Sequence, residues 1–174
     1  VLDNSIDYRS DIEESLLRQK NDYEVATDSR ITITYDYIRK DLSQAPWVAT
    51  NSQFGSKYVS PDWIRQNAKN LGDYYSVAYV FPYAMFDAPG VGGWSMGFYN
   101  GYHIQLIRGY SKNNTANPVR LMYLAFIEEL MHGWDEYFWY EKGWNLAQIL
   151  GVSNYDINIV HAENSNEVRW QYID

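Results

Sequence analysis

The stretch FIEELMHGWDEY, residues 126–137, sets two adjacent glutamates, a histidine and two further acids within nine positions. Glu128 and His132 are four positions apart, so on a helix they share one face, with Glu129 slightly around it. A carboxylate inside an apolar helix is costly unless it is paired or bound to a metal. With a histidine at position 128 the pattern would read H-E-x-x-H, in which the outer side chains hold a metal ion and the glutamate reaches the metal-bound water. The geometry is that of this motif, with the first ligand changed.

The composition limits what can surround this stretch. The chain has 174 residues, which favours one domain, and no apolar run approaches the ~20 residues that span a bilayer. It has no cysteine, so a metal must be held by His, Asp or Glu. Its net charge of −8 argues against a nucleic acid or an anionic membrane as partner. The start at Val1, without a charged and apolar leader, favours a processed protein that is secreted or extracytoplasmic, and we expect a monomer.

Hydrophobic patterns upstream of residues 126–137 predict the strands that must position this stretch. Residues 29–40 alternate apolar and polar side chains, which predicts a strand with one buried face. The nearly continuous apolar run 74–83 predicts a central strand. Residues 94–110 predict two strands that turn at Asn100-Gly101, because this dipeptide favours tight hairpins.

Three segments are expected to be helical. Residues 11–20 have apolar side chains at helical spacing, and we expect this helix to lie on the outside of the domain in a separable N-terminal segment. Residues 60–73 begin with Ser-Pro and close near a glycine, which predicts a helix of about three turns. Residues 118–132 begin with proline and are mostly apolar, which predicts a helix buried nearly all round that Gly133 can end or bend.

In this order of elements the chain resembles the zincin-type zinc metallopeptidases. Their upper subdomain runs from a strand through a backing helix and further strands to an edge strand that aligns substrate, and then to the active-site helix. The resemblance implies an α+β, zincin-like fold with a mixed twisted sheet, a backing helix and a buried active-site helix. It divides the single domain into an N-terminal helical segment (1–28), an upper subdomain (29–132) and a small lower C-terminal subdomain (133–174). The implied activity is zinc-dependent hydrolysis of a peptide or protein substrate by an endopeptidase.

The same resemblance implies roles for individual residues. Glu129 is the general base, His132 is a zinc ligand and Glu128 occupies the position of the first ligand. A tyrosine beyond the helix, Tyr137, is the candidate for stabilising the oxyanion. The candidates for the third zinc ligand are Asp135, Glu136, His161 and Glu163. An extended peptide would add along residues 95–100, and the substrate-binding candidates are Gly97, Phe98, Tyr99 and His103.

The changed first ligand leaves alternatives open. Two carboxylates and one histidine would neutralise the charge of zinc and weaken its effect on bound water. Three explanations of Glu128 are open: the chain is an inactive natural relative, Glu128 is an engineered replacement that blocks cleavage, or the site binds its metal through carboxylates. His132 could instead be a core histidine, and His103 a structural one. The seven Trp and 17 Tyr also suit a carbohydrate-binding or glycoside-active domain, and a third possibility is a zincin-like fold kept as a non-catalytic peptide-binding module.

Overall fold

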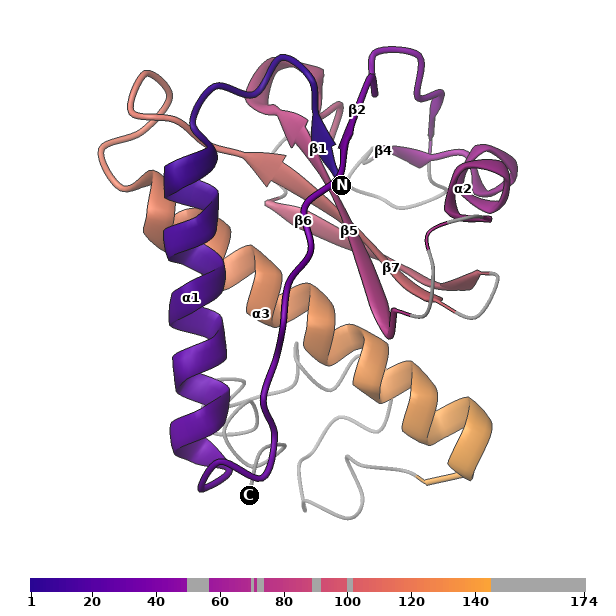
Figure 1. The fold of residues 1–174 in the computed structure, drawn as a ribbon. Helices are drawn as coiled ribbons and strands as arrows, with labels where there is room; N and C mark the ends of the chain where they lie inside the picture. Colours follow the sequence, from indigo (N-terminus) through magenta and orange to yellow (C-terminus); the bar gives the residue numbers. More distant parts are fainter. Residues whose placement is uncertain (50–56, 70, 72–73, 89–91, 100–101, 145–174) are drawn as a thin grey trace.

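The structure is a computed structural model that describes residues 1–49, 57–69, 71, 74–88, 92–99 and 102–144 (Figure 1). Its main sheet has five strands in the order β2-β1-β5-β7-β6. The first four in this order are parallel to one another: β2 (Arg39–Lys40), β1 (Leu2–Asp3), β5 (Ser76–Pro82) and β7 (Tyr102–Gly109). β6 (Gly93–Tyr99) forms the edge and runs antiparallel to β7. The predicted α+β class with a mixed sheet is confirmed.

Both faces of the sheet are covered (Figure 1). On one face α1 (Arg9–Ala26) packs against α3 (Pro118–Glu136), and α3 also contacts β6 and β7. On the other face lie α2 (Pro61–Ala68) and a two-stranded antiparallel sheet of β3 (Trp47–Ala49) and β4 (Lys57–Val59). β5 contributes Val77 and Tyr79 to the core under α2 and Val80 to the core under α1 and α3. Because both of its faces are buried, the strand is apolar almost throughout, and the prediction of a central strand is confirmed.

The predicted strand at 29–40 is wrong for most of its length. Only Arg39–Lys40 pair in the sheet, as β2, and residues 31–38 have no regular secondary structure. The alternation is real, since Ile33, Tyr35 and Tyr37 are half-buried and pack on the core clusters. The alternation therefore indicates an extended segment with one buried face. It does not indicate whether another strand pairs with that segment.

The N-terminal segment is part of the core, which corrects the expectation of a separable outer helix. β1 lies between β2 and β5 in the sheet, and Ile12, Leu16 and Tyr23 of α1 are buried. A two-residue strand carries no period that a sequence pattern could reveal. The helix predicted at 60–73 is shorter, ending at Ala68, although Pro61 does occupy its first turn.

Gly133 does not end the buried helix. α3 continues to Glu136 and passes directly into a π-helical turn, η2 (Tyr137–Glu141), so the expected boundary at 132/133 lies inside a helix. The first half of α3 is not buried all round, because Leu121 is 37% exposed. The predicted hairpin is confirmed by the pairing of β6 with β7, although residues 100–101 lie outside the described residues. None of the described helices combines the length and apolar character that crossing a bilayer requires.

Candidate functional site

The second half of α3 lies beneath the edge of the sheet, and Glu129 faces that edge. The Glu129 side chain is 5% exposed. A Cβ atom built on Gly93 at the start of β6 would lie only 2.6 Å from Cγ of Glu129 and 2.7 Å from its Oε1. Gly93 therefore lets the carboxylate reach the backbone of the edge strand, and any larger residue there would displace it. No local pattern indicated this pairing, because the two residues are 36 positions apart in the chain.

Glu136 faces the same strand two helical turns further on. A Cβ atom on Gly97 would lie 2.9 Å from Oε2 of Glu136, and Gly97 has a positive φ of 78°. The pairing register shifts between Ser95 and Gly97, so a β-bulge turns the strand where it meets this carboxylate. Burial raises the pKa of Glu136 above its ordinary value, which favours the protonated form of this acid. Two glutamates of α3 thus lie along β6.

Glu128 and His132 are one turn apart on α3, as their spacing predicts. Glu128 is half-buried and His132 is 8% exposed. Neither of them, nor Glu129, is without an interaction partner.

The described residues do not by themselves complete a metal site. Among them no group of three or more His, Cys, Asp or Glu side chains could hold a metal ion. Glu136, one candidate third ligand, faces Gly97 and does not join Glu128 and His132 in such a group. The other candidates lie outside the description: His161 and Glu163 entirely, and Asp135 through its side chain. Zinc would thus have at most two ligands from the described part of α3.

His103 is a buried histidine in the centre of this arrangement. It is 0% exposed, and its Nε2 lies 2.9 Å from Ser95 Oγ while its Nδ1 lies 3.1 Å from Ser76 Oγ. Burial lowers its pKa to about 3, so the ring is neutral. A Cβ on Gly133 would lie 2.5 Å from the ring, so α3 rests directly on it. Of the two interpretations of His103, this burial favours the structural one over substrate binding, and neither serine partner was identified from the sequence.

Aromatic rings join the end of α3 to the edge strand. The Phe98 ring of β6 is 39% exposed and lies 6.5 Å from the Tyr137 ring and 6.0 Å from the Tyr75 ring. Lys142 Nζ lies 5.3 Å from the Tyr137 ring centroid, within cation–π range. The structure thus brings together Gly97, Phe98 and Tyr137 of the predicted site. The side chain of Tyr99 lies outside the described residues.

Comparison with known proteins gives no independent assignment. No family model matches the chain, and no curated protein or solved structure matches it either.

Proposed function

We propose that this chain is a zincin-type metallopeptidase domain in a variant form, which holds an extended peptide along β6. The variant character follows from Glu128, which stands where the motif has its first histidine. Glu129 would serve as the general base, and zinc would be held by Glu128, His132 and a third ligand from Asp135, His161 or Glu163. Secretion, a monomeric state and the role of Tyr137 at the oxyanion remain predictions.

The order of the elements supports this proposal. The zincin-type upper subdomain begins with a strand and a backing helix, and β1 and α1 take these places instead of the segments 29–40 and 60–73. Further strands, an antiparallel edge strand and a helix beneath that edge follow in the expected order.

The observation that carries the proposal is the contact between Glu129 and Gly93. A peptide that adds to the free edge of a sheet lies within reach of side chains beneath that edge. β6 is the edge strand, and the carboxylate that the motif makes the base lies against its backbone. The carbohydrate alternative has less support at this strand, because Trp94 packs on the core and stacks with Tyr58 at 6.5 Å.

Zinc titration by calorimetry tests the metal part of the proposal. We compare the wild type with Glu128→His, and we use Glu14→His, an exposed change on α1, as the matched control. Restoring the first histidine should raise zinc affinity at least tenfold and produce cleavage of a random quenched-fluorescent peptide library. In that background Glu129→Gln should keep the zinc and lose the cleavage, because an amide cannot take a proton from water. A gain no larger than that of the control would refute the convergence of residues 128 and 132 on a metal.

The edge strand is tested separately with two substitutions at one position. In a hairpin with a two-residue connection the flanking pair, Tyr99 and Tyr102, is hydrogen-bonded, so the N–H of Phe98 should point away from β7. Phe98→Pro removes the ring and this donor, whereas Phe98→Ala removes the ring alone. Binding of the same peptide library should fall with proline and survive with alanine, provided both variants melt cooperatively. Equal losses would show that the peptide binds to the ring rather than to the strand.

A further inference from the structure

A second candidate site lies on a different face of α3, beneath the extended segment 31–38, which we call the strap. A cavity of about 500 Å³ separates the strap from the sheet, a volume within the ordinary range for sites that bind small molecules. Ala78 and Val80 of β5 form part of its lining, together with Leu16 of α1 and Phe126 and Trp134 of α3. Most of the lining is apolar or aromatic, so a ligand would be held mainly by hydrophobic contact.

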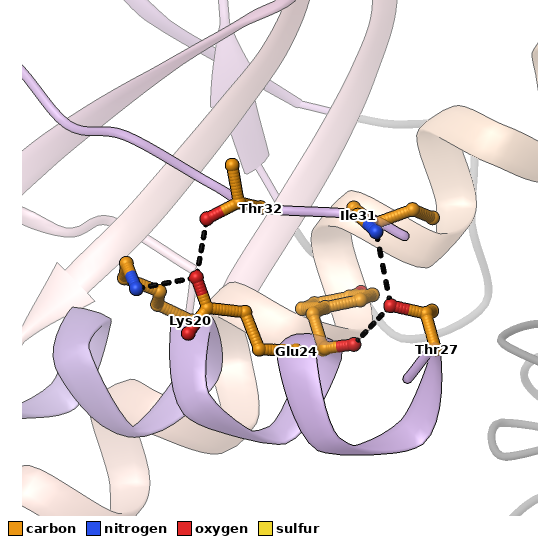
Figure 2. A network of polar contacts seen from close by, with 6 residues as sticks. Lys20, Glu24, Thr27, Ile31 and Thr32 are labelled. Carbon is orange, nitrogen blue, oxygen red and sulfur yellow. Dashed lines mark hydrogen bonds and ion pairs between the residues drawn. The ribbon is translucent and has the colours of Figure 1, made fainter. Parts of the chain in front are cut away.

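The strap is fastened at several points, which preforms the cavity. At its beginning the Thr32 hydroxyl donates to Glu24, which also binds Lys20 at 2.5 Å, and the Ile31 N–H donates to Thr27 Oγ1 at 3.0 Å (Figure 2). Further along, the Tyr35 hydroxyl donates to Gln19 Oε1 at 3.0 Å.

The far end of the strap is held in the same way. The Tyr74 hydroxyl donates to Asp36 at 2.8 Å, and the Leu2 N–H donates to the Ile38 carbonyl oxygen at 2.7 Å. A ligand would therefore enter a formed cavity without first having to order the strap, which lowers the entropic cost of binding.

One buried side-chain atom in the lining has no hydrogen-bond partner in the part of the chain that the structure describes. Gln105 is 5% exposed, and among the described residues its Oε1 atom has no hydrogen-bond partner. Its amide nitrogen donates to Ser76 Oγ at 2.7 Å, and Ser76 Oγ in turn donates to the His103 carbonyl oxygen at 3.1 Å. Because the single hydroxyl proton of Ser76 is directed to His103, at its carbonyl oxygen or at Nδ1 3.1 Å away, Gln105 presents its N–H to Ser76 and its oxygen elsewhere. A buried acceptor without a partner is costly, and a donor on a ligand would remove that cost.

The charges around the cavity exclude most ionised ligands. The described residues that line it include no Lys, Arg or His side chain, and Asp36 contributes a carboxylate. The Val1 amino group also lines the cavity, but it donates to the Ala78 carbonyl oxygen at 2.7 Å, and burial lowers its pKa to about 5, so it is largely neutral at pH 7. A carboxylate or phosphate ligand would therefore find no cation there and would be desolvated beside the Asp36 carboxylate. A neutral hydroxyl group can donate to Gln105 without this penalty.

We propose that the cavity binds a small, neutral, mainly apolar molecule that donates one hydrogen bond, from a hydroxyl group, to Gln105 Oε1. Alkylphenols and alcohols of similar size are the chemical class that this combination fits. The cavity is distinct from the peptide-binding edge along β6, because the α3 residues that line it do not include Glu129 or Glu136.

Three related probes test the proposal on the full chain by calorimetry and ligand-observed NMR. 4-Propylphenol offers a donor, 4-propylanisole has the same ring with the donor methylated, and 4-propylbenzoate carries a charge. We expect the phenol to bind about tenfold more tightly than the anisole, as one net hydrogen bond allows, and the benzoate to bind most weakly. Equal affinity for phenol and anisole, or no binding of either, would overturn the proposal.

Two variants locate the binding. Gln105→Met keeps the length of the side chain and removes the acceptor, so the preference for phenol over anisole should disappear while the anisole still binds. Ala78→Leu fills the floor of the cavity and should abolish binding of both probes without lowering the melting temperature by much. Phenol binding that is unchanged in Ala78→Leu would place the ligand outside the cavity and refute the assignment. The comparison of probes on the wild type remains decisive if either variant fails to fold.

Discussion

Replacing Gly133 by alanine has two opposite effects on stability: it raises the helix propensity of α3 and it crowds the ring of His103. The contacts in the structure indicate that the crowding is the larger effect. In the interior of a helix this change ordinarily stabilises by about 1 kcal/mol, because glycine has the greater freedom in the unfolded chain. Here the new Cβ would lie 2.5 Å from Cε1, Cγ and Nδ1 of His103, whereas carbon atoms in contact prefer about 3.5–4.0 Å. The ring or the helix must therefore shift by about 1 Å.

The ring cannot shift without loss, because Ser76 and Ser95 hold its two nitrogens. Overpacking costs about 1–3 kcal/mol, and each weakened hydrogen bond costs about 1 kcal/mol more. After the gain in propensity is subtracted, we expect Gly133→Ala to lower the free energy of unfolding by about 2 kcal/mol. Urea unfolding should show this as a midpoint lower by about 1 M at an unchanged slope.

A double-mutant cycle between residues 133 and 103 tests whether the contact with the His103 ring causes the loss of stability. In a His103→Ala background the ring is absent, so Gly133→Ala should become stabilising by about 1 kcal/mol, the value of helix propensity alone. A midpoint that rises with Gly133→Ala in the wild type would show that α3 does not rest on His103. The same loss in both backgrounds would place the clash elsewhere.

Three further predictions concern His103 and two other contacts, Gly97 with Glu136 and Thr27 with Ile31. Burial lowers the pKa of His103 from 6.5 to about 3, so between these pH values the unfolded chain binds a proton that the folded state does not. This contribution to the free energy of unfolding is fully present above pH 6.5 and is lost as the pH falls towards 3, by about 1.4 kcal/mol per pH unit. His103→Gln should remove this part of the pH dependence in urea titrations from pH 6 to 4. Gly97→Ala should destabilise by about 1–2 kcal/mol in thermal melts, because φ is positive and the new Cβ meets Glu136; an unchanged melting temperature would contradict the bulge. Thr27→Val should cost about 1 kcal/mol and speed hydrogen exchange of the Ile31 amide, whose acceptor is lost; an unaltered exchange rate would mean that the strap is not anchored there.

Elements with a long and uniform pattern could be predicted from the sequence. The hairpin of β6 and β7, the central strand β5 and the buried helix α3 were all identified, because each repeats its period over several residues. The one-turn spacing of Glu128 and His132 was also predictable, since it follows from helical geometry alone. The mixed α+β class follows from these elements together.

Other features depend on partners that are distant in sequence. The alternation at 31–38 is genuine, yet the segment is a strap over a cavity, because pairing in a sheet requires a neighbour that the local sequence does not specify. β1 is too short to carry a period, so its central place in the sheet was not foreseen. Gly133 was expected to end or bend the helix, whereas in the structure it leaves room for the ring of His103.

The sequence by itself determined the chemistry that is available: no thiol, a net negative charge, and two glutamates and a histidine on one apolar helix. Only the tertiary structure decided how these groups are used. It placed Glu129 against Gly93 of the edge strand, buried His103 between two serines, and left the oxygen of Gln105 without a partner among the described residues beneath the strap. The physical reason is that side-chain type and helical spacing are local properties. Burial, desolvation and hydrogen-bond satisfaction depend on which distant segments pack against a residue.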